Sequence, residues 1–485
     1  MQDWLDLFST KENNRPDPSS SNLSSPYMRD EDKSELDVGQ AMPVSLPQEI
    51  KEEVIQHLHT NKPALKACAL ASRALLAPSQ KHLFAHILLL PPLNKRGPNA
   101  RKLKALLSTS PHLGPYVRFL EVFRYHSIAD LICDSQEDWL AKDTALAYCL
   151  PLLGKLQGLV IDFKTSNFWY ESSYEGSVAS MVENGLVDAL RRVISLPSMV
   201  LLDVGGFPFG LLRHCGSGLK HLTLHTLRNV DLGLACPCVE SIPKANFALE
   251  SLSFTAWDRD RAEYAAFEKT RKLFDLSGLK KLSARAHFDA ESHRQIWSII
   301  EECSSTLEEF VLVPCDEIGR GAQDPIEWDK LSSLKSLDIR MRFEYHGEAA
   351  FLWLLNAVEK ISSAPAGSHL ESILIQVKRK SKAGGGCDAA FLDNLERLLC
   401  KKSRFPVLKS VHLRIVAVHE AVNPEDGPNL AYEAEAVAEE LAKNEDRRPH
   451  FKVSLLRDRR EEFHPGFSPD PSWTKTTYFD LWDRI

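Results

Sequence analysis

A short pattern of leucines and other apolar residues recurs along most of this chain, and it constrains the fold more than any other feature of the sequence. The pattern is an apolar residue, two variable residues, a second apolar residue, one variable residue and a third apolar residue. Clear copies start 27 to 38 residues apart, at Leu219, Leu249, Leu279, Leu307, Leu334, Leu370 and Leu408. Weaker copies start at Val117, Leu156 and Met199. Recurrence of this kind predicts an array of structural repeats.

Each copy has the pattern of a short buried strand, because its last two apolar residues are two positions apart and therefore share one face. Between copies, apolar residues at helical spacing, such as Ile296, Ile299 and Ile300, predict covering helices. One strand and one helix cannot bury their apolar faces alone, so the repeats must stack. We therefore expect an α/β solenoid over residues 91–456, which is curved, with short parallel strands inside and helices outside.

This arrangement resembles leucine-rich repeats of an irregular kind, which lack the usual Asn after the strand. In the segment LKSLDIRMRF, for example, no Asn follows Ile339. The resemblance covers about Val117 to Leu413, and one more strand is expected at Phe451, Val453 and Leu455. Such an array presents outward strand positions to a protein substrate. The predicted substrate contacts are Lys220, Thr223, Lys280, Ser283, Glu308, Lys335 and Asp338.

Residues 44–90, ahead of the repeats, have the pattern of three short helices. Leu46-Pro47 opens the first helix, because Pro at the first helical position loses no hydrogen bond. An apolar stripe follows at offsets of four and three, made up of Ile50, Val54, Ile55 and Leu58. Two further helical stretches follow the break at residues 60–63. About forty residues cannot make an independently stable core, so this unit must pack on the rest of the chain or on a partner.

The order Leu-Pro-x-Glu-Ile, Ile-x-x-Leu, Leu-x-x-Cys-x-Leu-x-Ser-Arg and Leu-Phe between Leu46 and Phe84 resembles an F-box, in the short form abundant in fungi. Ala74 stands where a large aromatic residue is often found. The resemblance implies docking on the Skp-type adaptor of a cullin ubiquitin ligase, and through it on a cullin. The residues that match the family's core or adaptor contacts, and so are predicted to bind the adaptor, are Leu46, Pro47, Ile50, Ile55, Leu58, Leu65, Leu70 and Leu76.

The leading hypothesis is thus a substrate-recognition adaptor of an SCF-like ubiquitin ligase. The alternative is a repeat scaffold that binds a protein partner without ubiquitin chemistry, with the helices serving as an N-terminal cap. The two hypotheses differ in whether the apolar face of Leu46–Leu76 is exposed or is packed on the first repeats, against Leu88, Leu89 and Leu90.

No motif predicts catalysis, a cofactor or a metal site, so we expect the chain not to be an enzyme. His82 and His86 lie four apart on an expected helix but lack a third ligand. Cys236 and Cys238 lack the second pair that a zinc site needs. The basic run Lys378–Lys382 fits a solvated loop better than a nuclear import signal or an anion contact.

Composition narrows the partners and the compartment. A net charge of -7 argues against nucleic acid as the main partner. No apolar run approaches the ~20 residues that span a bilayer, and the first residues lack the pattern of a secretory signal. Ten cysteines without paired spacing suit reduced thiols in the cytoplasm or nucleus. Residues 1–43 are expected to be disordered, and residues 457–485 to form a tail or cap.

Overall fold

The computed structural model describes residues 46–90, 99–123, 139–162, 179–228, 248–255, 271–286, 290–314, 326–343, 347–364, 369–380, 394–395, 397–399, 404–418 and 450–458. The segment 1–43 that we expect to be disordered lies outside these residues. So do nearly all of the expected tail and the pair Cys236 and Cys238.

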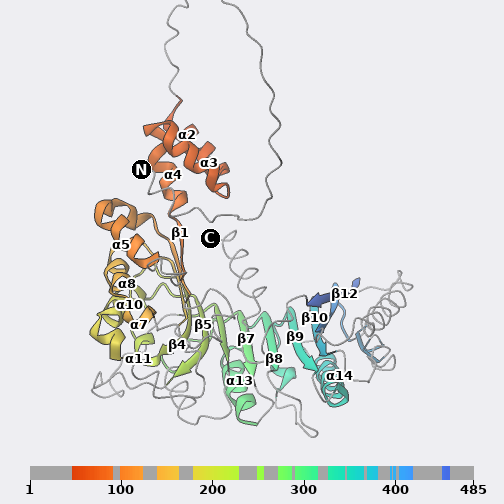
Figure 1. Ribbon diagram of the computed structural model, residues 1–485. Coiled ribbons are helices and arrows are strands. Elements are labelled where there is room, and N and C mark those ends of the chain that lie inside the picture. The colour runs from red at the N-terminus through yellow and green to blue at the C-terminus, as the bar shows by residue number, and fades with distance from the viewer. Residues whose placement is uncertain are drawn as a thin grey trace, which may run out of the picture.

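A single 12-stranded sheet runs through the chain, with its strands in sequence order. All eleven neighbouring pairs are parallel. The strands are β1 (His86–Leu89), β2 (Phe119–Val122), β3 (Gly158–Asp162), β4 (Leu201–Pro208), β5 (His221–Arg228), β6 (Ser251–Thr255), β7 (Lys281–Ala286), β8 (Glu309–Pro314), β9 (Ser336–Phe343), β10 (Ser372–Lys380), β11 (Ser410–Val418) and β12 (His450–Asp458). The sheet bends into an arc (Figure 1). The predicted α/β class and the parallel sheet are confirmed, and the arc is consistent with a curved solenoid.

The repeated apolar pattern explains why the strands form where they do. Its first residue precedes each strand, and its second and third residues lie within the strand in register with their counterparts in neighbouring strands, as Leu222, Leu252 and Leu282 do. None of the described side chains in these three rows is more than 7% exposed. The expected twelfth strand at Phe451 is also present. Continuous apolar rows of this kind are the core of a stacked repeat protein.

The tight turns before successive strands stack on one another, although the repeats lack the Asn that is usual after the strand in leucine-rich repeats. Hydroxyl groups bond to the turn of the preceding repeat instead. Ser198 Oγ donates to the Leu156 carbonyl at 2.8 Å, Thr306 Oγ1 to the Leu279 carbonyl at 3.0 Å, and Ser333 Oγ to the Ser305 carbonyl at 2.6 Å. These bonds give each of the three turn carbonyls a hydrogen-bond donor.

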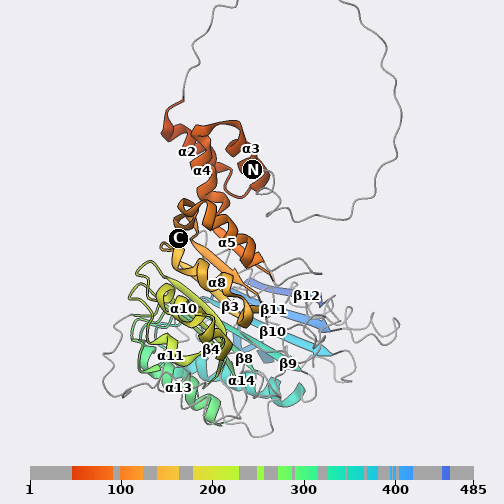
Figure 2. The same ribbon diagram turned by 60° about the vertical axis from the view of Figure 1, so that its left-hand side comes forward.

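Helices cover one face of the sheet, on the outer side of the arc (Figures 1 and 2). They are α5 (Asn99–Thr109), α7 (Trp139–Lys142), α8 (Thr144–Cys149), α10 (Leu186–Ile194), α11 (Phe209–Leu212), α13 (Ala290–Cys303) and α14 (Gly347–Ser363), with 3-10 turns η2 (Pro111–Tyr116), η3 (Leu150–Leu152) and η5 (Trp328–Lys330). The helix expected around Ile296 and Ile300 is α13, and both side chains are fully buried. The opposite face, here called the open face, carries the side chains between the buried rows.

Three helices precede the sheet and form the helical module (residues 46–84). They are α2 (Gln48–His57), α3 (Lys62–Ala71) and α4 (Arg73–Leu83). Asn61 Oδ1 accepts the Ala64 N–H at 3.1 Å at the start of α3, and Ser72 Oγ accepts the Ala74 N–H at 3.2 Å at the start of α4. Side-chain oxygens at these positions favour helix initiation. Both views place the module beyond the β1 end of the sheet (Figures 1 and 2).

Two expectations for this region need correction. His82 lies in α4 and His86 lies in β1, so the two residues do not share a helix. The residues 44–90, which we assigned to the helical module, also contain the first strand of the sheet. The basic run that we expected in a loop is also different, because Lys378–Lys380 belongs to β10 and pairs with β11. Strand β10 pairs with β9 and β11 along its length, and this pairing extends the sheet into the basic residues Lys378–Lys380.

Candidate functional site

The described side chains offer no evident reactive centre. No three His, Cys, Asp or Glu residues within the described ranges are grouped closely enough to hold a metal ion. Burial raises the pKa of the Cys149, Cys215 and Cys303 thiols to about 12, so these three thiols are poor nucleophiles. No helix in the same ranges is long and apolar enough to cross a membrane. The features that remain as candidate sites are surfaces that can bind a partner.

The helical module exposes large apolar side chains. Leu46 is 53% exposed, Ile50 48%, Val54 49% and Leu70 54%. These are four of the nine exposed large hydrophobic side chains among the described residues. The module contributes only a small part of the described residues, so such side chains are concentrated in it. Clustered exposed apolar side chains are unusual on a protein that functions alone, and they mark interaction surfaces.

Helix α2 divides its apolar stripe between two environments. Residues four apart on an α-helix are separated by only about 40° around the axis, so Ile50 and Val54 lie on one side of α2. Leu46 lies just before the helix, next to its N-cap Pro47. Ile55 lies one residue beyond Val54 and is fully buried, on the side that packs with α4. Leu58 is half-buried between the two environments. The line Leu46–Ile50–Val54 is here called the exposed line.

The eight residues predicted to bind the adaptor thus fall into three groups. Leu46, Pro47, Ile50 and Leu70 are exposed, Leu58 and Leu76 are half-buried, and Ile55 and Leu65 are fully buried. The last two form the core of the module and cannot contact a partner while the module stays folded. Val54 belongs with the exposed group, and the sequence interpretation left it out of the site. Its spacing of four from Ile50 is the signal that identifies it.

The described residues of the first repeats do not cover the exposed line. Leu89, which was expected to cover it in the scaffold hypothesis, is 2% exposed and lies in β1, in register with Val122 of β2. The module instead contacts the rest of the chain through the end of α4, where Leu83 and Phe84 are buried and where α4 lies against η2. Only Phe84 and Ala85 separate α4 from β1, so this junction is short and direct.

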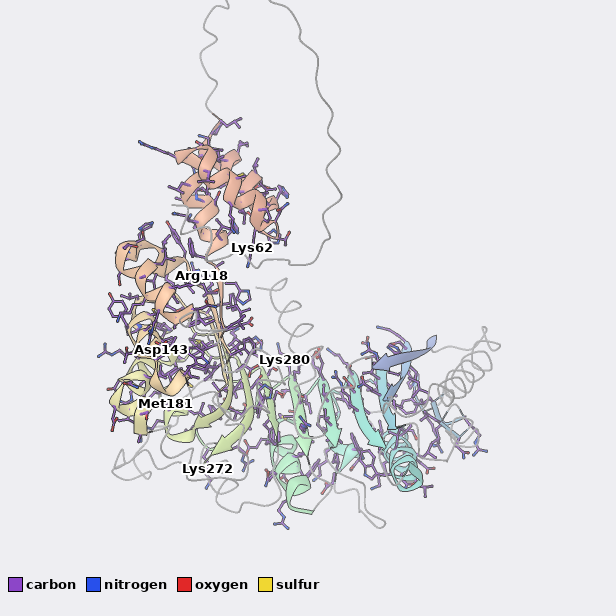
Figure 3. All side chains as sticks on the ribbon, viewed as in Figure 1. Lys62, Arg118, Asp143, Met181, Lys272 and Lys280 are labelled. Atoms are coloured by element: carbon purple, nitrogen blue, oxygen red, sulfur yellow. The ribbon has the colours of Figure 1, made fainter. Side chains whose placement is uncertain are left out.

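A second feature lies along the edge of the sheet where the strands begin. Lysine and glutamate alternate there across seven neighbouring repeats, and this row is here called the charge ladder. Its members are Lys220, Glu250, Lys280, Glu308, Lys335, Glu371 and Lys409. Backbone hydrogen bonds join each member to the next, for example from the Lys280 N–H to the Glu250 carbonyl at 3.0 Å. Figure 3 marks Lys280 at this edge.

Ion pairs connect the members of the charge ladder. Lys220 Nζ lies 2.7 Å from Glu250 Oε1, and Lys335 Nζ lies 2.9 Å from Glu308 Oε2. The hydrogen bond from Lys220 holds the pKa of Glu250 below its usual range, and the bond to Glu308 raises the pKa of Lys335. The ladder therefore keeps alternating full charges at neutral pH, without a net field of one sign.

The predicted substrate contacts divide between this ladder and the open face. Lys220, Lys280, Glu308 and Lys335 are ladder members. The alternation was visible in the second residue of successive copies (LKHL, LESL, LKKL, LEEF, LKSL, LESI and LKSV), but it emerges only when the copies are aligned.

The remaining three predicted contacts lie in one row of the open face, which the register aligns across β5 to β9. Thr223 is half-buried. Ser283 is 6% exposed, so it leaves little surface for a partner. Asp338 accepts a 2.8 Å hydrogen bond from Arg340 Nη2.

No family model matches the sequence, and a search of the curated proteins finds no match either.

Proposed function

We propose that this chain is the substrate-recognition subunit of a cullin-type ubiquitin ligase, with an F-box-like module that docks on a Skp-type adaptor and irregular leucine-rich repeats that hold a protein substrate. The observation that carries the proposal is the exposed line Leu46–Ile50–Val54 on a module that otherwise has its own buried core. The sequence order that resembles an F-box includes Leu46 and Ile50, and both are half exposed.

In this proposal the chain contributes position rather than bond chemistry. Helix α4 leads into β1 with no long linker, and Leu83 and Phe84 anchor its end. A short, anchored junction keeps the repeats in a defined place relative to the docked adaptor. A substrate bound to the repeats would then meet the ubiquitin-carrying enzyme at a high effective concentration.

The alternative, a scaffold with a helical cap, requires the first repeats to cover the apolar face. Leu46, Ile50, Val54 and Leu70 all stay about half exposed, which favours the adaptor subunit. A scaffold would still bind a partner through its repeats, so the two functions separate on adaptor binding alone.

Co-purification tests the proposal. The full chain, co-expressed with a Skp-type adaptor, should give a one-to-one complex, and Leu46→Asp combined with Ile50→Asp should abolish it. The matched control is Val182→Asp with Leu352→Asp, because these side chains are 41% and 55% exposed outside the module. The control should leave the complex intact, and circular dichroism should show all variants folded.

Two results would contradict the proposal. One is a folded wild-type chain that never binds the adaptor. The other is loss of the complex in the Val182 and Leu352 control to the same extent as in the Leu46 and Ile50 variant, since that would assign the binding to general surface hydrophobicity.

A further inference from the structure

The open face of the sheet changes its charge from one half to the other. In β1 to β5 its described acidic residues are paired with histidines, as His86 Nε2 lies 2.7 Å from Glu121 Oε1 and His225 Nε2 lies 3.0 Å from Asp203 Oδ1. Within β7 to β11 the described positions of this face carry more cations than anions. The cations are Lys281, Arg285, Arg340 and Arg414, and the anions are Glu309 and Asp338. A chain with net charge -7 therefore gathers positive charge on one half of this face.

Three of these cations stand in one row. Gln376 of β10 is in register with Arg340 of β9 and with Arg414 of β11. On the other side, Arg285 of β7 is in register with Val313 of β8. The residues before Val313 and Arg340, which are Leu312 and Ile339, are paired, so Val313 lies next to Arg340. The row thus alternates arginine with an uncharged residue, and Arg285, Arg340 and Arg414 are here called the arginine row. All three side chains are half-buried and reach solvent.

The spacing of the arginine row matches an extended peptide. Neighbouring strands are about 4.8 Å apart, so arginines on every second strand are separated by about 10 Å. An extended chain covers about 10 Å in three residues. Side chains three residues apart point to opposite sides of a β-strand. In a polyproline-type conformation, which has three residues per turn and a rise of about 3.1 Å per residue, every third side chain points the same way.

Arg340 is held in place for such a ligand. Its Nε donates to both carboxylate oxygens of Asp338, at 3.2 and 3.0 Å, and its Nη2 donates to Oδ2 at 2.8 Å. These bonds fix the plane of the guanidinium group on the open face. Arginine forms strong paired hydrogen bonds with carboxylates, and a guanidinium already oriented loses less freedom on binding.

We propose that the arginine row binds an acidic segment of the protein substrate, which lies extended across the strands with a carboxylate at every third residue. This inference rests on the proposed function, because it names the class of substrate that the repeats would hold. Val313 and Gln376 lie between the arginines, under the intervening residues of the segment. The backbone register also places Arg342 opposite Lys378, two residues farther along β9 and β10, so the basic sequence continues beyond the row.

Peptide binding to the full chain tests this inference without the adaptor. The probe is a fluorescein-labelled peptide with three aspartates spaced three residues apart, measured by fluorescence anisotropy. A matched peptide of the same composition has its aspartates adjacent. The variant Arg285→Gln, Arg340→Gln and Arg414→Gln should bind the spaced peptide at least about tenfold more weakly than wild type. The control variant removes three exposed arginines of the helical face, by Arg101→Gln, Arg192→Gln and Arg397→Gln.

The inference predicts that wild type prefers the spaced peptide to the adjacent one, that the control variant keeps this binding, and that added salt weakens it. The single variant Arg414→Gln gives the same test, with a smaller loss, if the triple variant does not fold.

Equal binding by the triple variant and wild type would overturn the inference, as would equal binding of the two peptides. Stronger competition from a single-stranded oligonucleotide than from the peptide would overturn it too. A chain that binds the adaptor but not the peptide refutes this inference alone, and a chain that binds the peptide but not the adaptor refutes only the proposed function.

Discussion

The helical module and the repeats place the same kind of residue in opposite environments. Leu46 and Leu70 of the module are 53% and 54% exposed, whereas Leu282 and Leu337 of the repeats are fully buried. Burial of one such side chain contributes about 1.5 to 3 kcal/mol to stability. Leucine in the repeats therefore stabilises the chain itself. Leu46 and Leu70 instead leave apolar area exposed, which a partner can bury.

The two regions also differ in how their cores are built. Each repeat adds one rung to apolar rows that run through the whole sheet, so its stability comes from its neighbours. The module relies on a few buried side chains, among them Ile55, Leu65 and Leu83. A partner that covers the exposed line would stabilise the module by mass action. Substitutions should accordingly act on folding in the repeats and on binding in the module.

The largest contrast should come from Phe310→Ala compared with Ile50→Ala. Phe310 is fully buried in β8, and its ring centroid lies 6.0 Å from that of Trp328. Phe310→Ala leaves a cavity there and should lower the free energy of unfolding by about 3 to 5 kcal/mol. Ile50→Ala removes a half-exposed side chain and should change it by less than about 0.5 kcal/mol. Urea denaturation of both variants makes the measurement.

In the adaptor-binding assay we expect the opposite ranking: Ile50→Ala should have the larger effect and Phe310→Ala the smaller one. Ile50→Ala should weaken the complex with the adaptor, while Phe310→Ala should leave it intact at temperatures where the repeats stay folded. Similar losses of stability in the two variants would show that the exposed line also packs within the chain, and the contrast between the regions would then fail.

Much of the fold is predictable because the spacing of apolar residues is a local property. The copies starting at Leu219 to Leu408 predict β5 to β11, and the side chains that they place inside are buried. Strand β1 was not predicted, although Phe84, Ile87 and Leu89 fit the repeated pattern, because we assigned these residues to the helical module. The strand assignment of Lys378–Lys380 was not predictable either. It depends on pairing with residues more than thirty positions away, which a basic sequence does not indicate.

The candidate site was predictable only as a set of positions. Helical spacing indicates that Ile50, Val54 and Ile55 share an apolar stripe. It does not indicate which edge of that stripe the neighbouring helix covers. Ile55, which we expected to contact the adaptor, is buried, and Val54, which we left out of the site, is exposed. The charge ladder was missed for a different reason. Its members are far apart in the sequence, and the parallel register brings them together.

A smaller effect is expected where the turns of successive repeats meet. A Cβ atom on Gly218 would lie 2.2 Å from the Pro197 carbonyl oxygen and 3.0 Å from that of Met199. Both oxygens belong to the backbone of the preceding repeat, which cannot move away as a flexible side chain can. Gly218→Ala should therefore lower the free energy of unfolding by about 1 to 3 kcal/mol.

Gly154→Ala is the matched control for this prediction. Gly154 lies in the turn before β3, and a Cβ atom there would have no neighbour within 4 Å. Thermal melting of the two variants should show a clear drop only for Gly218→Ala. Equal melting temperatures would mean that the stacked turns can separate at little cost, so that the repeats would be as tolerant of substitution as the surface of the module.

The smallest effect should come from the charge ladder, and it should depend on pH. Because the hydrogen bond from Lys220 lowers the pKa of Glu250 in the folded chain, the ionised carboxylate stabilises the fold. This contribution is present above the pKa of an unfolded glutamate, about 4.3, and is lost as the pH falls through the lower folded value. Glu250→Gln should thus be less stable than wild type at neutral pH and equal to it in strong acid.

The size of this difference decides what the charge ladder does. The Glu250 side chain is 39% exposed, so solvent screens the pair, and we expect a loss of only about 0.2 to 0.5 kcal/mol, which high salt should reduce further. Denaturation of both proteins at neutral and acidic pH, with and without salt, measures it. A loss several times larger that salt does not change would place the ladder among the main stabilising features of the repeats. The expected small loss would leave the apolar rows as the source of stability, and the ladder as a surface whose alternating charges oppose the pairing of repeats out of order, because skipping one repeat would set lysine beside lysine.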